Sequence, residues 1–293
     1  NGMSTETMRL KKGTRLKLRA RRSPPPRERI EYVVAEGDDW WSVARAHGAD
    51  VHDLQAYNWP HRDKMVPGKT IVVWSDPVVR GWIAQDNADQ LGVSDGGAGV
   101  GSPDAGWLIG GARIPEGEGY VLHQPAWSYG TTHAVRELVR ALAAYHEAGG
   151  PLVELGAMSK LRGGEIGDHR SHQTGRDVDI GLPRRVGLSR MIPLTNRRID
   201  WIGVWTLIEV LAAADVDVVW LHYEQQKRVH EAALKAGVPR ERVAKLLQYP
   251  MGRASRALVH HAEGHDLHLH VRFGCGPCEP ECVDARNPEL ASP

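Results

Sequence analysis

The stretch HRSHQTGRDVD, residues 169–179, gathers two histidines and two aspartates in a short run, and GHDLHLH, residues 264–270, adds three more histidines. Histidine and carboxylate side chains are ligands that zinc accepts in enzymes. So many of them in two short runs indicate a metal site rather than an ordinary polar surface.

Side-chain alternation along strands decides which of these groups can meet. Asp177 and Asp179 point to the same side of a strand, and so do His268 and His270. Two such strands placed side by side could offer His172, Asp179 and one histidine of the second run to one ion. Zinc in a hydrolase usually takes three protein ligands and keeps a fourth position for water.

Around these runs, apolar residues recur at helical spacing or in short strand-like runs. The expected helices are 134–145, 202–214 and 224–236, and the expected strands are 152–155, 216–221 and 266–273. Residues 91–111 are rich in glycine and too poor in apolar periodicity to form a core. The alternation predicts an α+β fold with a mixed or antiparallel sheet.

A separate pattern occupies residues 31–74, where a strand, two short helices and a second strand are expected. Its motifs YVVAEGDDWWSVA and PGKTIVV resemble the LysM domain along its whole length. The resemblance implies a small βααβ module that binds glycans containing N-acetylglucosamine, such as peptidoglycan. The candidate glycan contacts are Gly37, Asp38, Trp40, Asn58 and Trp59, with the tryptophans stacking on sugar rings.

The opening residues repeat part of this pattern, since Asn1 precedes Met8 by the interval that separates Asn58 from Met65. We therefore expect a series of segments along the chain. They are the remnant of an upstream LysM-like repeat (1–20), a proline-rich spacer (21–30), the LysM domain (31–75), a linker (76–98) and the catalytic domain (99–293).

Composition restricts the function classes. The formal net charge of +1 gives no overall field that would attract nucleic acid, so no nucleic-acid partner is expected. No window reaches the roughly 18 consecutive apolar residues of a membrane span. The chain begins with Asn-Gly and carries no export signal, and we interpret its N-terminus as cut.

All three cysteines lie in CGPCEPEC, residues 275–282. A zinc knuckle would need a fourth ligand, and a redox CxxC would be expected near a βαβ pattern. The favoured interpretation is a local disulfide with one cysteine left over, which indicates an oxidising compartment.

The two histidine-bearing motifs, extended to DHRSHQTGRDVDI (168–180) and GHDLHLHVRFGC (264–275), resemble the penicillin-insensitive murein endopeptidases. GSPDAGWLIGGARIPEGEGY and KLRGGEIGDHRSHQTG support the resemblance, which runs from about residue 99 to residue 282. It implies the zinc fold shared with D-Ala-D-Ala carboxypeptidases and hedgehog proteins, with a central, mainly antiparallel sheet. It also implies location in the periplasm or elsewhere in the cell envelope, after export.

Residue by residue, the resemblance makes His172, Asp179 and His270 the ligands of one Zn²⁺ per catalytic domain. It places His268 and His265 beside the attacking water, and His169 as a further active-site residue. A neutral His268 could accept the proton of water, and a protonated His268 or His265 could stabilise the oxyanion or protonate the leaving amine. The sequence does not divide these roles.

Several residues keep two interpretations. Asp177 could accept the second N–H of a ligand histidine or be purely structural. Arg162, followed by Gly163-Gly164, could bind a meso-diaminopimelate carboxylate or lie on the surface. HExxH is absent, so a glutamate base of the thermolysin type is not available, and Glu263 is only a weak candidate for that role. Seven further histidines are expected to be surface or satisfied core residues: His123, His133, His146, His222, His230, His260 and His261.

The leading hypothesis is a zinc endopeptidase that hydrolyses peptide cross-links of peptidoglycan while the LysM domain holds the glycan. The favoured target is the D-alanyl to meso-diaminopimelyl bond. One alternative is a non-catalytic wall-binding protein with a degenerate peptidase fold. Another is a D,D-carboxypeptidase, which would release free D-alanine instead of monomeric muropeptides.

Overall fold

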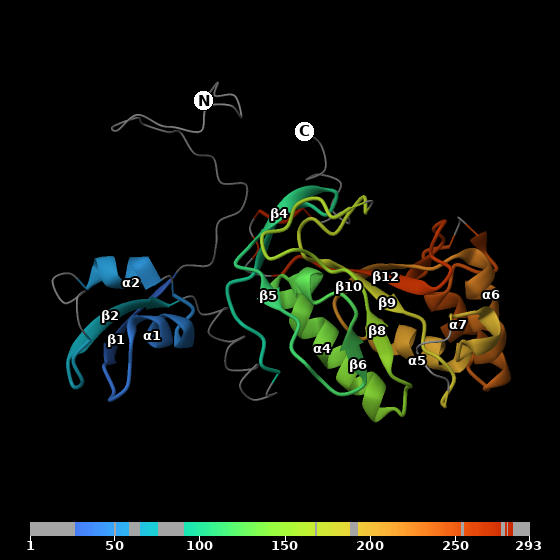
Figure 1. Cartoon of the computed structure of the whole chain (residues 1–293), viewed down its shortest axis with the longest axis horizontal. Helices are drawn as coiled ribbons and strands as arrows, with labels where there is room; N and C mark the ends of the chain where they lie inside the picture. The colour runs from blue at the N-terminus through green and yellow to red at the C-terminus, as the bar shows by residue number, and fades with distance from the viewer. Residues whose placement is uncertain are drawn as a thin grey trace, which may run out of the picture.

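The computed structural model describes residues 27–49, 51–58, 65–75, 91–167, 169–187, 193–252, 255–276, 279 and 281–283. Figure 1 shows the arrangement of the elements. The expected upstream repeat (1–20), most of the spacer, Trp59, Cys278 and the linker up to residue 90 lie outside the described residues.

The N-terminal module has the expected order of strand, helix, helix and strand. Its elements are β1 (Glu28–Val33), α1 (Trp40–Ala46), α2 (Val51–Tyr57) and β2 (Thr70–Ser75). β1 pairs antiparallel with β2. It begins at Glu28, inside the expected spacer, because Glu28 pairs with Ser75 at the end of β2. The side chain of Asp39 caps α1 through a bond to Ser42 N–H of 2.7 Å.

The second body is built on a six-stranded sheet in the order β11-β10-β12-β9-β8-β6. The strands are β6 (Tyr120–Leu122), β8 (Val153–Leu155), β9 (Asp177–Gly181), β10 (Val216–Trp220), β11 (Val259–His260) and β12 (His268–Phe273). The pairs β10–β12, β12–β9 and β9–β8 are antiparallel, whereas β6–β8 and β10–β11 are parallel. The sheet is therefore mainly antiparallel, as predicted.

Helices pack against this sheet with their apolar sides. They are α4 (Thr132–Glu147), α5 (Trp201–Leu211), α6 (Tyr223–Lys235) and α7 (Arg240–Leu246). Residues of α4, α5, α6 and α7 share one apolar core with the sheet. Three of the four agree with the expected helices, while α7 was not predicted. No helix in the described part of the chain has the length and hydropathy of a bilayer span.

Alternation along β9 and β12 divides the central sheet into two faces. Val178 and Ile180 of β9, with Leu269 and Val271 of β12, are fully buried in the helix-covered core. The intervening residues face the other side, and the antiparallel register sets His268 opposite Gly181, His270 opposite Asp179 and Arg272 opposite Asp177. The period of two thus separates the residues that stabilise the fold from those that build the site.

Part of the glycine-rich stretch 91–111 forms a hairpin, which was not among the expected strands. β3 (Ala98–Ser102) and β4 (Ala105–Ile109) form an antiparallel hairpin, and the short strands β5 (Ala112–Arg113) and β7 (Tyr129–Gly130) pair beyond it. Leu108 of β4 is buried, and so is Val93, which lies before the hairpin. A hairpin that packs through few apolar side chains has no strong alternation, so periodicity alone could not find it.

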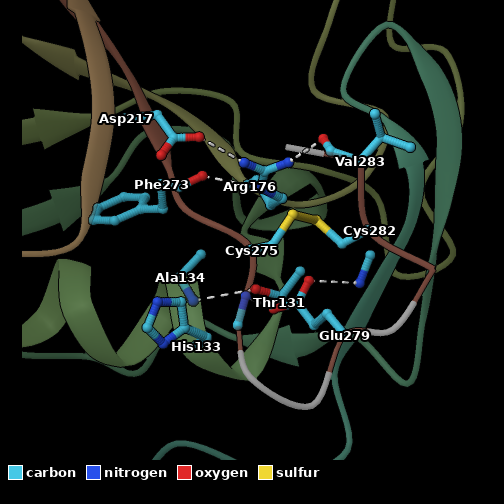
Figure 2. The surroundings of a disulfide bond; sticks show 12 residues. Thr131, His133, Ala134, Arg176, Asp217, Phe273, Cys275, Glu279, Cys282 and Val283 are labelled. Carbon is cyan, nitrogen blue, oxygen red and sulfur yellow. Dashed lines mark hydrogen bonds and ion pairs between the residues drawn. A yellow bond between two sulfur atoms is a disulfide. The ribbon is translucent and has the colours of Figure 1, made fainter. Parts of the chain in front are cut away.

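Residues 281–283 lie along this hairpin and are joined to the end of β12. Gly101 N–H donates to Glu281 O at 2.9 Å, and a disulfide joins Cys275 to Cys282. Figure 2 shows the disulfide next to the buried Arg176, whose guanidinium donates to Phe273 O, Val283 O and Asp217. These contacts hold the hairpin at the end of the central sheet.

Candidate metal centre

His172 occupies a strained and buried position at the end of the loop before β9. It is the one non-glycine residue in the described ranges with a positive φ, at 69°, and only 1% of it is exposed. Ser159 Oγ donates to His172 O at 2.6 Å, and His172 Nδ1 lies 3.1 Å from Met158 O. If Nδ1 donates to this carbonyl, Nε2 carries the lone pair that a ligand needs.

Asp179, on β9, is the point on which the histidines converge. Its Oδ1 lies 3.5 Å from His172 Nε2 and 3.5 Å from His270 Nδ1. His268 Nε2 is 3.7 Å from the same oxygen, and His169 Nδ1 is 3.8 Å from Oδ2. Residues from one loop and two paired strands thus meet around a single carboxylate.

Two buried atoms in this group lack the hydrogen bonds that burial normally requires. Within the described part of the chain, neither His172 Nε2 nor Asp179 Oδ1 has a hydrogen-bond partner. Burial would lower the pKa of His172, yet the adjacent Asp179 carboxylate raises it; the same pair lowers the pKa of Asp179 against the effect of burial. Buried polar atoms left unpaired suggest a bound ion, and the donor set of imidazole and carboxylate fits zinc.

Two histidines, His169 and His270, are candidates for the third ligand. His169, His172 and Asp179 offer ligand atoms within 4.8 Å of one another. The side chain of His169 is 35% exposed, however, whereas that of His270 is 11% exposed. His270 also has a partner for its second nitrogen, because Nε2 lies 3.4 Å from Asp177 Oδ2. A buried histidine with its far nitrogen held by a carboxylate is the usual form of a zinc ligand.

Asp177 is itself held by Arg272 of β12. The guanidinium donates from Nε to Oδ1 at 2.7 Å and from Nη2 to Oδ2 at 2.9 Å. Burial would raise the pKa of Asp177, but Arg272 and His270 outweigh it and hold the pKa well below its usual range. Arg272 stacks on Trp220 at 4.9 Å from the ring centroid. Asp177 is therefore an ionised acceptor for His270.

His268 and His265 remain closer to solvent. The His268 side chain is 33% exposed, and the His265 ring lies 4.9 Å from the His268 ring. Burial lowers the pKa of both side chains, so their neutral forms are favoured. Neutral imidazoles can accept protons, which suits the roles expected from the sequence.

A cleft runs past this group on two sides. The larger hollow, of about 830 Å³, is walled by the β3–β4 turn, by residues 169–172 and by residues 262–265. A smaller hollow of about 240 Å³ is lined by residues that include His123, Gln124 and Glu154. His169, Asp179 and His268 line both hollows, so the candidate centre lies where they meet.

Other predicted residues are not brought to this centre. Arg162 is exposed and does not line either hollow. Gly163 has a φ of 68°, and a Cβ there would collide with Gln173 O and Leu108 N. It permits close packing of the hairpin against the first motif instead of lining the cleft.

In the N-terminal module, the burial of Trp40 and Asn58 does not support their expected contact with glycan. Trp40 is a core residue, and the Asn58 side chain bonds to Leu54 O and to both backbone groups of Val72. Asp38 accepts from Tyr32 Oη and Ala35 N, each at 2.7 Å. Gly37 adopts a φ of 89° in the turn before α1.

Sequence reasoning missed Arg272 and Trp220. It named Glu263 as a weak candidate base but did not predict that His222 and His261 would lie with it beside the cleft. Alternation could have found Arg272, because it follows His270 by two residues on the same strand face. Trp220 lies opposite His270 in the register of β10 and β12, which the sequence does not reveal.

Comparison with known families agrees with this geometry. Residues 99–292 match the model of the family described as penicillin-insensitive murein endopeptidase, and residues 32–74 match the LysM domain. No curated protein matches the chain. Because the first match covers more than half of the 293 residues, the chain belongs to the penicillin-insensitive murein endopeptidase family and carries a LysM domain ahead of the peptidase region.

Proposed function

We propose that this peptidase is a zinc-dependent endopeptidase that cleaves D-alanyl to meso-diaminopimelyl cross-links of peptidoglycan. Family membership already implies a hydrolase that acts on murein, outside the cytoplasm. The observation that carries the finer proposal is the convergence of His172 and His270 on the unpaired, buried Oδ1 of Asp179. These three residues would hold the ion. When bound there, zinc supplies Lewis acidity and lowers the pKa of water toward ~7.

The chain's own residues provide the remaining chemistry. His268, whose pKa burial lowers, is neutral and accepts a proton from the attacking water. Because its Nδ1 faces Glu263 O, His265 on the neighbouring loop would donate a hydrogen bond to the oxyanion or a proton to the leaving amine only after Nε2 has been protonated. Asp177 accepts from His270 and keeps the imidazole in one orientation.

The two-sided cleft favours an endopeptidase over a carboxypeptidase. An endopeptidase must accommodate peptide on both sides of the cleaved bond, whereas a carboxypeptidase needs room for only one terminal residue on one side. The larger hollow of about 830 Å³ falls in the range of roughly 300–1,000 Å³ that holds a drug-sized ligand. The smaller hollow continues on the other side of Asp179 and His268.

The charges of the two hollows suggest how the substrate lies. Arg170 and Arg272 line the larger hollow, whereas among the described residues no lysine or arginine lines the smaller one. Because Arg272 already binds Asp177, Arg170 is the cation better placed for a substrate carboxylate. In a D-alanyl to meso-diaminopimelyl bond, the residue that supplies the nitrogen carries such a carboxylate beside it. The leaving amine would therefore occupy the larger hollow.

The test is mass spectrometry of the muropeptides released from purified sacculi by the protein and by its His172→Ala variant. We expect the parent to convert cross-linked dimers to monomers, and the variant to leave them intact while still sedimenting with sacculi. Release of free D-alanine without loss of dimers would instead identify a carboxypeptidase. Unchanged muropeptides from a parent that holds zinc and sediments would favour the wall-binding alternative.

A further inference from the structure

A second cluster of metal-competent side chains lies beside the cleft, outside the set around Asp179. His222 precedes α6, and His261 and Glu263 lie in the loop between β11 and β12. Glu263 Oε1 is 3.2 Å from His261 Nε2, and its Oε2 is 3.5 Å from His222 Nε2. Glu263 also lines the larger hollow.

The hydrogen bonds of the two rings argue against a metal in this cluster. Tyr223 N–H donates to His261 Nδ1 at 3.1 Å, and Glu224 N–H donates to His222 Nδ1 at 3.3 Å. A neutral imidazole has one protonated nitrogen and one acceptor. Since both Nδ1 atoms are acceptors, both Nε2 atoms carry protons. His261 Nε2 donates to Glu263 Oε1 at 3.2 Å, and His222 Nε2 makes a longer ion-pair contact with Oε2 at 3.5 Å. Asp266 Oδ1, at 3.6 Å from His222 Nδ1, is too far for a hydrogen bond.

These contacts hold the loop that carries His265. His222 N–H donates to His265 O at 2.8 Å, and His265 Nδ1 lies 2.9 Å from Glu263 O. The loop has no regular secondary structure between His261 and Leu267, and Glu263 and Gly264 are exposed. Its order therefore depends on individual backbone and side-chain contacts rather than on a helix or strand ladder. With His265 Nδ1 donating to the Glu263 carbonyl, His265 Nε2 is left as the nitrogen available to the cleft.

We propose that His222 and Glu263 are positioning residues: their contact holds the loop of residues 261–266 so that His265 faces the reacting group. This inference rests on the function proposed above, because it gives His265 a role in the reaction. His222 lines neither hollow, and the proposal gives Glu263 no contact with the reacting atoms. Their effect reaches the reaction through the backbone and orientation of His265.

The position of His222 allows a matched pair of variants. His222→Asn keeps an acceptor near the place of Nδ1 and so preserves the cap of α6, but it is too short to reach Glu263. His222→Gln extends an amide toward the place of Nε2 and keeps the Glu263 contact, but it is a poor cap. The two variants separate the loop contact from the stability of the helix.

We expect His222→Asn to lower kcat about 10-fold to 100-fold without a change in KM, because a small misplacement of a reacting group is costly. Its thermal midpoint should match that of the parent. His222→Gln should keep most of the kcat while unfolding at a lower temperature. In a His265→Ala background, His222→Asn should cause no further loss, because its effect acts through His265.

Several outcomes would overturn the proposal. Loss of activity in His222→Gln together with retention in His222→Asn would reduce His222 to a helix cap. Equal further loss in the His265→Ala background would show that His222 does not act through His265. Two zinc ions per parent chain, reduced to one in His222→Asn, would make the cluster a metal site. A parent that cleaves no cross-linked muropeptide would instead contradict the proposed function, and the two failures are therefore distinguishable.

Discussion

The two histidine-bearing motifs line one cleft but differ in burial and support. In the first, His172 and Asp177 are almost completely buried. A backbone carbonyl contacts the His172 ring, and Arg272 binds the Asp177 carboxylate. In the second, His268 is one-third exposed, and His265 is carried by a loop that other side chains hold in place. Burial and hydrogen bonds fix the side chains of the first motif, whereas those of the second are partly exposed to the cleft.

The difference suggests a division of work. A metal ligand must keep its geometry when the substrate is absent, which burial and second hydrogen bonds provide. A proton-transferring group must reach water and substrate, so it requires partial exposure. Two residues cross the division, because His169 of the first motif is exposed and His270 of the second is buried. They provide the most direct test of it.

The largest effect should separate His270→Ala from His169→Ala. If burial identifies the ligand, His270→Ala purifies with almost no zinc and no activity, because the ion loses one of its three protein ligands. His169→Ala should keep one zinc per chain and lose activity only in part. Metal analysis of the purified proteins, with turnover of a cross-linked muropeptide, measures both effects. Zinc lost from His169→Ala but kept by His270→Ala would make His169 the third ligand.

A smaller effect should follow from changing a proton-transferring residue without touching the ligands. His268→Gln should lower kcat by roughly 10²–10⁴ while zinc content stays at the parent level, since an amide cannot take up the proton. His146→Gln, on α4, is the control and should behave as the parent. Steady-state kinetics with metal analysis measures the change. If His268→Gln loses its zinc, His268 acts as a metal ligand, and the division between buried ligands and exposed proton-transferring residues is wrong.

Much of this architecture is predictable because it follows from local patterns. The LysM module, the helices α4, α5 and α6 and the strands β9 and β12 each depend on periodicity or a motif within their own residues. The two faces of β9 and β12 also follow from alternation, which places His268, His270, Asp177 and Asp179 on one side. The order of metal-competent residues along the chain was therefore enough to predict one site.

The rest depends on pairings between distant segments. Trp220 reaches His270 only through the register of β10 and β12, and His222 reaches His265 across a loop that packs on the start of α6. The β3–β4 hairpin is stabilised by the C-terminal residues beyond β12 rather than by its own apolar pattern. Nothing in the local sequence of these segments records such partners, so their contribution to the cleft could not be predicted.

The smallest effect should come from Asp177, which belongs to the first motif but acts on the second. Asp177→Asn replaces an ionised acceptor, whose pKa Arg272 and His270 hold well below the usual range, with a neutral amide. We expect zinc affinity or activity to fall about 10–100-fold, as for other carboxylates behind a ligand histidine. Competition with a chelator measures the affinity. If zinc affinity falls while the kcat of the zinc-loaded variant is unchanged, Asp177 contributes only to metal binding. If kcat falls as well, the orientation of His270 also affects the proton-transferring residues, and the two motifs are coupled through the Asp177 carboxylate.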